Sequence, residues 1–179
     1  MPTRNPGLEA ADPSVAAPSR HFYADDDDVF EVALHEPGAT PVVPERLIQD
    51  LWQAQRFDTA GLATTDDEAV TVLDPGRLNT DTGPDFTSAR LKVGETEWRG
   101  SVEIHATSGG WYAHRHHVDP RYNSVVLHVT LHPDVWTGGL HRADGTVVPE
   151  VVLYPRLERS LRDLLYTFLT QPRADPLCA

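Results

Sequence analysis

Two segments of the chain carry hydrophobic residues at the spacing of a helix. The first, residues 44–55, opens with Pro44 and Glu45, which suit the first turn and the positive end of a helix dipole. The second, residues 157–169, repeats leucine along one side. We therefore predict two amphipathic helices, each with one buried face. The hydrophobic positions of the first helix are Leu47, Ile48, Leu51 and Trp52.

Between these segments the hydrophobic period changes to two, which is typical of β-strands because side chains alternate between the two faces. Gly94 and Glu95 separate two such runs and predict the turn of a hairpin. A histidine-rich segment then predicts a loop or a short helix before the next strand. The predicted strands are residues 69–73, 86–93, 97–105, 124–131 and 147–154, with a further short strand at 29–34.

The order of these elements is helix, three strands, loop or short helix, then strand. It predicts an α/β fold with a mixed β-sheet flanked by helices. An all-β sandwich is the alternative, because short strands separated by turn signals are typical of that fold. Residues 29–170 are expected to form a single globular domain. Residues 1–28, which are acidic and rich in proline, are expected to be a flexible tail, and residues 171–179 a C-terminal tail.

The composition is that of a globular protein, with 40% hydrophobic and 23% charged residues. The net charge of −12 opposes non-specific nucleic-acid binding, but it does not exclude a local cleft in which a metal ion supplies positive charge. No segment resembles a membrane span or the apolar core of a signal peptide, so we expect a cytoplasmic protein with no membrane partner. The single cysteine excludes an internal disulfide.

Three residues on two neighbouring predicted strands form the strongest candidate site. Glu103 and His105 are two positions apart and project from the same face, and Asp85 precedes the strand that pairs with theirs, about 5 Å away. Two carboxylates on neighbouring strands suit Mg²⁺ or Mn²⁺. The metal would activate a water and neutralise a phosphoryl oxygen, and His105 would position that water or become a third ligand. We therefore predict catalytic and metal-binding functions for these three residues.

Six of the nine histidines lie between positions 105 and 132. If the histidine-rich loop folds back over the sheet, His105, His114 and His128 can converge, and such a set of imidazoles suits Zn²⁺ or Fe²⁺. The alternative is that loop histidines are solvated and that His128 only makes hydrogen bonds within the sheet. Three others, His116, His117 and His132, are assigned to the ordinary surface.

Further residues are predicted as second members of the site or as its wall. Tyr122 and Asn79 are expected to position substrate or to cap turns, with capping favoured for Asn79. The complete set of second members is His114, Asp119, His128, Tyr122 and Asn79.

The spacing of the acids and the histidine resembles the PD-(D/E)xK nuclease superfamily. Pro84-Asp85 matches the first half of the motif, and Glu103-Ile104-His105 matches the second, with histidine where lysine is usual. The resemblance implies a restriction-endonuclease-like αβββαβ core and metal-dependent hydrolysis of a nucleic-acid phosphodiester. It would make nucleic acid the partner of this chain.

Several longer motifs resemble, in fixed order, an uncharacterised bacterial family called "domain of unknown function 2851". The resemblance covers residues 43–155 and implies no activity. Members of that family are longer, so it implies a shortened member or a part of a longer protein. The motifs are Pro-Gly-Arg-Leu-Asn at 75–79, Gly-Pro-Asp-Phe at 83–86, Trp-Arg-Gly-Ser-Val-Glu-Ile-His at 98–105 and Tyr-Asn-Ser-Val-Val-Leu-His-Val at 122–129.

These observations leave three functions open, and they also leave the oligomeric state open. The leading hypothesis is a metal-dependent phosphodiesterase or nuclease-like domain centred on Asp85, Glu103 and His105. The first alternative is a non-catalytic β-sandwich module that binds carbohydrate or protein through the aromatic and histidine loop around Trp111. The second is a metalloenzyme that acts on a small molecule and uses the histidines to bind Zn²⁺ or Fe²⁺.

Overall fold

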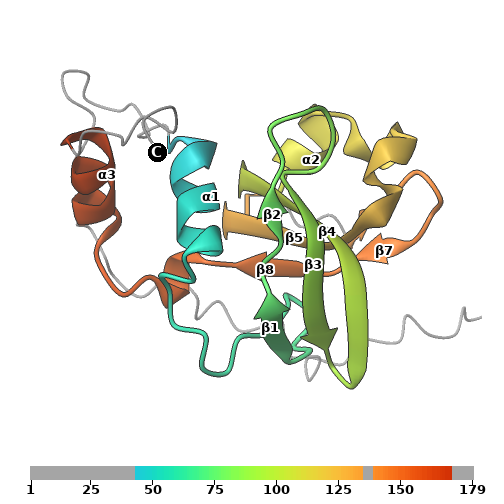
Figure 1. Cartoon of the computed structure of the whole chain (residues 1–179), viewed down its shortest axis with the longest axis horizontal. Coiled ribbons are helices and arrows are strands. Elements are labelled where there is room, and N and C mark those ends of the chain that lie inside the picture. Colours follow the sequence, from blue (N-terminus) through green and yellow to red (C-terminus); the bar gives the residue numbers. More distant parts are fainter. Residues whose placement is uncertain (1–42, 135–138, 171–179) are drawn as a thin grey trace, which may run out of the picture.

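A mixed β-sheet with helices packed against it forms the centre of the molecule (Figure 1). The computed structural model describes residues 43–134 and 139–170. The predicted strand at 29–34 and the predicted tails at 1–28 and 171–179 lie outside these residues. The described elements, in chain order, are α1 (Glu45–Gln53), β1 (Val70–Asp74), β2 (Arg77–Leu78), β3 (Phe86–Val93), β4 (Thr96–Thr107), α2 (Gly110–Ala113), the 3₁₀ helices η1 (His116–Val118) and η2 (Pro120–Ser124), β5 (Val125–His132), β6 (Leu140–His141), β7 (Val147–Val148), β8 (Glu150–Val152), the 3₁₀ helix η3 (Tyr154–Arg156) and α3 (Leu161–Thr170).

The main sheet has the strand order β1-β3-β4-β5-β8, and the short β2 pairs with β3. The first strands are antiparallel, whereas β4 with β5 and β5 with β8 are parallel. Parallel neighbours need a crossover connection, which α2, η1 and η2 provide between β4 and β5. The predicted α/β class with a mixed sheet flanked by helices is therefore confirmed. The alternative of an all-β sandwich is wrong, because α1 packs against β4.

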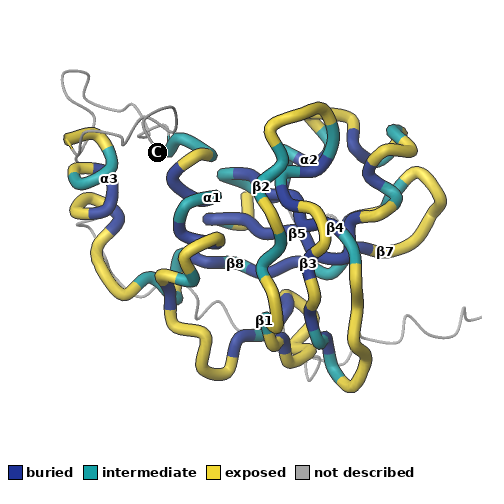
Figure 2. The backbone as a smooth tube through the Cα atoms, in the orientation of Figure 1, coloured by how far each residue is buried: buried dark blue, intermediate teal, exposed yellow. Residues whose placement is uncertain are grey.

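Helix α1 buries the face that its hydrophobic spacing predicts. Leu47, Ile48, Leu51 and Trp52 are all buried in the core that also contains residues of the sheet, and Figure 2 shows buried stretches alternating with less buried ones along α1. The Trp52 indole N–H donates a hydrogen bond to the Pro75 carbonyl oxygen, which ties the helix to the loop between β1 and β2. The helix ends at Gln53, two residues earlier than the spacing predicts.

The sheet is covered on both faces around β5, whose first seven residues are all buried. One core joins α1 and α3 to the sheet. A second, smaller core joins the crossover to β6 and β7 and contains Trp111, Tyr122, Val125, Leu140 and Val148. A strand with both faces covered is typical of the parallel part of a sheet. The second core holds the histidine-rich crossover against β4 and β5.

Two predicted elements differ from the structure at their boundaries. The segment 147–154 is divided at Pro149, so β7 pairs with β6 while β8 joins the main sheet beside β5. Proline cannot donate a ladder hydrogen bond, which explains the division. The last helix begins at Leu161, and part of the segment before it forms η3. The strands β2 and β6 were not predicted, because two residues are too few to show a hydrophobic period.

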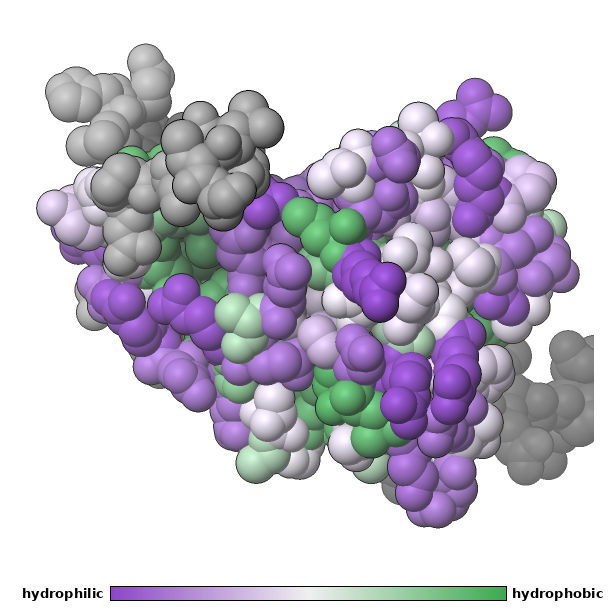
Figure 3. Space-filling view, viewed as in Figure 1, coloured by the Kyte–Doolittle hydropathy of each residue, from purple (hydrophilic) through white to green (hydrophobic). Residues whose placement is uncertain are grey.

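The surface is mainly hydrophilic on the face shown in Figure 3, with only small hydrophobic areas between polar side chains. This distribution agrees with the net charge of −12 and with the burial of most large hydrophobic residues in the two cores. Within residues 43–134 and 139–170, no helix combines the length and the apolar content that a bilayer crossing requires.

Gly100 marks a close approach between β4 and the start of β5. A Cβ atom at Gly100 would lie 2.4 Å from the Ser124 carbonyl oxygen and 2.5 Å from Val126 Cγ1. Because the backbone of β5 cannot move without disturbing the sheet, we expect Gly100→Ala to lower the free energy of unfolding by about 1–3 kcal/mol in urea titrations. Thr96→Ala, at an exposed position of the same strand, is the control. A Gly100→Ala variant as stable as this control would contradict the close packing.

Candidate functional site

The candidate site lies where the crossover covers β4 and β5. Strand pairing places Glu103 of β4 opposite His128 of β5, and His128 opposite Glu150 of β8. His105 lies two residues further along β4 than Glu103. The alternation along β4 predicted that Glu103 and His105 share a face, and the crossover folds over that face. It adds two histidines from its own helices, His114 at the end of α2 and His116 in η1.

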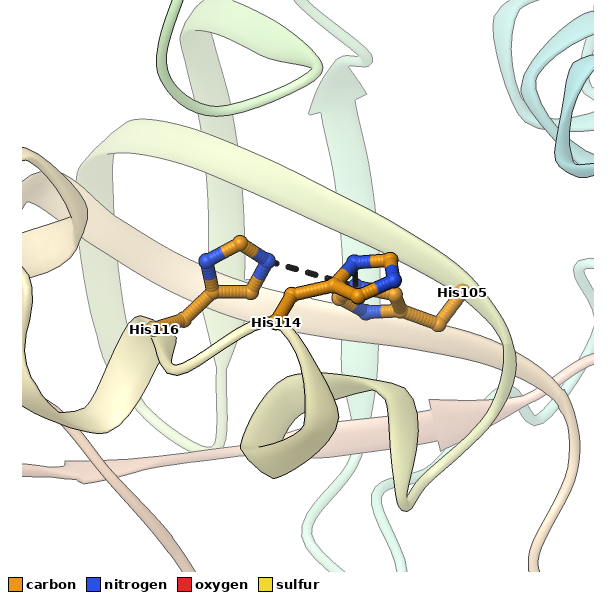
Figure 4. A group of neighbouring side chains, drawn as sticks. All are labelled: His105, His114 and His116. Atoms are coloured by element: carbon orange, nitrogen blue, oxygen red, sulfur yellow. Dashed lines mark hydrogen bonds between the residues drawn. The ribbon is translucent and has the colours of Figure 1, made fainter.

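Three imidazole rings converge at this position (Figure 4). His105 Nε2 is 3.0 Å from His114 Nδ1 and 3.3 Å from His116 Nε2. The three ligand-capable nitrogens all lie within 4.8 Å of one another. His105 and His116 are buried, whereas His114 is exposed. The cluster is therefore enclosed on one side and open to solvent on the other, and such a group of nitrogens can hold a metal ion.

Glu103 adds a carboxylate to the three histidines. Its Oε1 atom is 3.1 Å from His116 Nε2 and 3.7 Å from His105 Nε2. Its Oε2 atom accepts a hydrogen bond from the backbone N–H of Asp85 at 3.0 Å. Glu103 thus connects the histidine cluster to the segment that precedes β3.

Asp85 lies beside Glu103, as the hairpin predicted, but both of its carboxylate oxygens have partners. Oδ1 accepts a hydrogen bond from the Gln49 side chain on α1 at 2.9 Å, and Oδ2 accepts one from the Ile104 backbone N–H at 2.9 Å. The structure therefore links Asp85 to helix α1 and to β4 while placing it next to Glu103. The sequence did not predict Gln49 as part of the site, because a polar residue next to the hydrophobic face of a helix is ordinary.

The buried position of these groups shifts their titration. Burial raises the pKa of Asp85 to about 7, and the neighbouring Glu103 charge adds to this shift. Burial also raises the pKa of Glu103 to about 8, although the hydrogen bond from the Asp85 backbone acts in the opposite direction. Burial and then the neighbouring His128 lower the pKa of His105 to about 2, which keeps its ring neutral. The surroundings of these three groups thus favour their uncharged forms.

A chain of hydrogen bonds extends from the cluster into the sheet. His105 Nδ1 is 2.8 Å from His128 Nε2, and His128 Nδ1 is 2.8 Å from Glu150 Oε1. The His128 side chain is fully buried, and that of Glu150 is nearly so. The sequence predicted His128 as a possible member of the site, and the structure connects it to the cluster through His105. Glu150 was missed, because Pro149 interrupts the period of its segment.

Aromatic rings and a glycine hold the cluster in place. Tyr122 stacks on His116 with ring centres 3.7 Å apart. The Trp111 ring meets both His116 and His128 edge to face. A Cβ atom at Gly110 would lie 2.6 Å from two ring carbons of His105, so the absence of a side chain at this position lets α2 lie directly against that imidazole.

Other predicted residues lie apart from the cluster. Asp119 forms an exposed ion pair with Arg121 and caps η2, so both of its carboxylate oxygens already have partners. Asn79 caps a turn, since its amide donates to the Pro84 carbonyl oxygen and its side-chain oxygen accepts from the Asp81 backbone N–H.

The assignment of His116 to the ordinary surface is wrong, because its ring is buried and contacts Glu103. No pattern in the sequence distinguishes His116 from the neighbouring loop histidines. His117 and His132, by contrast, lie against tyrosine rings outside the cluster: His117 against Tyr112 and His132 against Tyr154.

A model of the family described as "Protein of unknown function (DUF2851)" matches residues 45–179 of this chain. This description names no activity, substrate or cofactor. Neither the curated proteins nor the solved structures gave a match. The chemistry of the site has therefore to be argued from its own residues.

The raised pKa values of Asp85 and Glu103 predict how stability depends on pH in chelator-treated protein. Each folded-state pKa lies above the ordinary value of its group, 3.8 for Asp85 and 4.5 for Glu103. The two neutral carboxyl groups therefore stabilise the fold fully below pH 4, and this contribution is lost as pH rises through about 7 to 8. The lowered pKa of His105 changes the free energy of unfolding only below pH 6.5, the ordinary pKa of histidine, and so does not affect this range. We therefore expect the free energy of unfolding to fall by about 2 kcal/mol between pH 6.5 and pH 8.5, at about 1.4 kcal/mol per pKa unit.

Urea titrations at several pH values measure this effect, and Glu103→Gln should remove most of it because glutamine does not titrate. The control is Glu95→Gln, since the Glu95 side chain is 96% exposed in the hairpin turn. Stability that is constant across this pH range in the wild-type chain would contradict the raised pKa values.

Proposed function

The chain belongs to the family described as proteins of unknown function (DUF2851), and from its site we propose that it is a metal-dependent hydrolase that cleaves phosphodiester bonds of nucleic acid. The observation that carries the proposal is the meeting of Glu103 with three imidazoles at one enclosed position. His114, the exposed member, lies on the side that a substrate can reach. A bound cation there lowers the pKa of a water ligand and stabilises negative charge on the substrate.

In this proposal each residue has a role that follows from its position. Glu103 and His105 bind the cation from the buried side. Asp85 orients Glu103, because its backbone N–H holds one carboxylate oxygen and leaves the other directed at the histidines. Gln49 fixes Asp85 in turn, so α1 supports the site from the far side of the hairpin. The site thus has a rigid base and one side open to solvent, as a hydrolytic metal site requires.

The order of the elements supports the choice of phosphodiester as substrate. Helix α1, the antiparallel strands β1, β3 and β4, a helical crossover, and then β5 parallel to β4 follow the αβββαβ order (Figure 1). Asp85 immediately precedes β3, and Glu103 and His105 lie on β4. These are the positions that the resemblance to PD-(D/E)xK nucleases implies for the acidic pair and the third residue. The substrate class rests on this resemblance and on the element order.

A second candidate function is hydrolysis of a small molecule at the same metal site. The net charge of −12 favours it, because an acidic surface repels a long polyanion and has less effect on a small substrate. The two candidates share the metal chemistry and differ only in the size of the substrate.

The proposal predicts that Glu103→Gln abolishes metal-dependent cleavage. The chain is stripped with chelator, reloaded separately with Mg²⁺, Mn²⁺ or Zn²⁺, and assayed on single-stranded and double-stranded DNA, on RNA and on a chromogenic phosphodiester. We expect the variant to lose at least about a hundredfold in rate, because losing a few kcal/mol of charge stabilisation costs a factor of ten per 1.4 kcal/mol. Circular dichroism confirms that the variant is folded.

Glu95→Gln is the matched control and should cleave at the wild-type rate. Cleavage of the chromogenic diester without cleavage of any nucleic acid would favour the small-molecule candidate. The proposal of a hydrolase is overturned if the folded wild-type chain cleaves none of these substrates with any of the metals, or if Glu103→Gln cleaves as fast as the wild type.

A further inference from the structure

We infer that the histidine cluster binds a transition-metal cation of the zinc class, and that Glu150 and His128 fix the ring of His105 in the form that binds it. The inference rests on the proposed function, which requires a cation at this site, and it names the class of that cation and its ligands. The four ligand atoms are His105 Nε2, His114 Nδ1, His116 Nε2 and Glu103 Oε1, and hydrolysis would require the exposed His114 to give its position to a water, because a catalytic zinc site keeps one position open.

Four of the separations between these atoms are close to those around a tetrahedral cation. Bonds of about 2.0–2.1 Å to nitrogen or oxygen place the ligands of a tetrahedral Zn²⁺ about 3.4 Å apart. His105 Nε2 lies 3.0 Å from His114 Nδ1, 3.3 Å from His116 Nε2 and 3.7 Å from Glu103 Oε1, and the separation between His116 Nε2 and Glu103 Oε1 is 3.1 Å. These four values lie on both sides of the expected separation. His114 and His116 approach His105 Nε2 from different sides, with the three nitrogens within 4.8 Å of one another, so the exposed ring of His114 would have to turn inward for a tetrahedral cation to bind.

The hydrogen bonds behind His105 determine which of its nitrogens carries the proton. A neutral imidazole has one N–H donor and one acceptor nitrogen. The Glu150 carboxylate accepts from His128 Nδ1, so His128 Nε2 is the acceptor. His105 Nδ1 must then donate to it, and His105 Nε2 is left with a lone pair directed into the cluster. In many metal sites a carboxylate accepts a hydrogen bond directly from a ligand histidine and fixes its orientation. Here Glu150 would act on His105 through one further histidine, His128.

The surroundings of His105 Nε2 suit a cation better than a set of hydrogen bonds. The His105 Nε2 lone pair can accept a hydrogen bond from His114 Nδ1 at 3.0 Å, and His116 Nε2 at 3.3 Å and Glu103 Oε1 at 3.7 Å then face the same nitrogen without a second lone pair between them. In addition, His116 Nδ1 is buried and has no hydrogen-bond partner among the described residues. That ring is therefore held by stacking on Tyr122 and by what its Nε2 atom binds. A single cation contacts all four ligand atoms at once.

The ligand set selects the class of cation. Imidazole nitrogen suits Zn²⁺, Fe²⁺ and their neighbours, whereas Mg²⁺ prefers oxygen and a nearly ideal octahedron. A Mg²⁺ site here would need Asp85, yet both of its carboxylate oxygens already accept hydrogen bonds from Gln49 and Ile104. Three nitrogens and one oxygen therefore favour the Zn²⁺ or Fe²⁺ alternative over the Mg²⁺ or Mn²⁺ expected from the acid pair.

The first experiment titrates chelator-treated wild-type chain with Co²⁺, whose visible absorption reports tetrahedral nitrogen and oxygen ligation. We expect one equivalent to bind with a tetrahedral spectrum, Zn²⁺ to displace it, and a large excess of Mg²⁺ to leave it in place. His114→Ala removes an exposed ligand with little risk to folding and should weaken binding strongly. His141→Ala, at an exposed histidine outside the cluster, is the control.

The second experiment tests the hydrogen-bond chain with Glu150→Gln, which removes the charge but keeps the shape of the side chain. We expect about 10- to 100-fold weaker Zn²⁺ binding in competition with a chromophoric chelator. The nitrogen-15 chemical shifts of His105 should also show that the proton is no longer confined to Nδ1, a change that loss of packing alone does not produce. The control, Glu158→Gln, alters an exposed carboxylate and should change neither measurement.

The outcomes separate this inference from the proposed function. If the folded wild-type chain binds neither Co²⁺ nor Zn²⁺, the inference is overturned, and cleavage supported by Mg²⁺ would leave the hydrolase proposal standing. If one tetrahedral Co²⁺ binds and no substrate is cleaved, the inference is supported and the proposed function fails. Unchanged affinity and unchanged nitrogen shifts in Glu150→Gln would overturn the part assigned to Glu150 and His128.

Discussion

The parallel pairing of β4 with β5 is the constraint on which the rest of the structure depends. Two parallel strands cannot be joined by a tight turn, so the chain must leave the end of β4 and return to the start of β5. That return is made by α2, η1 and η2, which cross the sheet face carrying Glu103 and His105. The same pairing sets Glu103 beside His128 and, through β8, beside Glu150. One topological requirement thus brings together residues from four separate parts of the sequence.

Burying ionisable groups beside one another is costly, and the fold offsets that cost with hydrogen bonds from several elements. Asp85 receives donors from α1 and β4, Glu103 receives one from the Asp85 backbone, and His128 is held by Glu150. These contacts also run from α1, which belongs to the larger core, to the crossover, whose Trp111 and Tyr122 belong to the smaller core. The polar network therefore links α1 to the crossover, and removing one member would disturb more than the local contact.

The hydrophobic period of the sequence predicted the strands correctly where one face of a strand is buried and the other is polar. It predicted β3, β4 and the turn between them, and with them the approach of Asp85 to Glu103 and the shared face of Glu103 and His105. It could not separate His116 from His117, because η1 is a single turn whose direction is set by packing on Tyr122. It also gave no sign of Glu150, which joins the sheet only after a proline and is placed by strands distant in sequence.

The ring of His105 is constrained from three sides, and this bears on how strongly the cluster can bind a ligand. His128 holds its Nδ1 atom, the backbone of Gly110 lies against its carbon edge, and the other histidines stand around its Nε2 atom. A group already held in its binding orientation loses little conformational freedom when a ligand arrives, so more of the interaction energy appears as affinity. Gly110 contributes without any polar atom, because any side chain there would displace the imidazole. The close packing of Gly110 against the His105 ring therefore helps to orient His105 Nε2, as the hydrogen bond to His128 does.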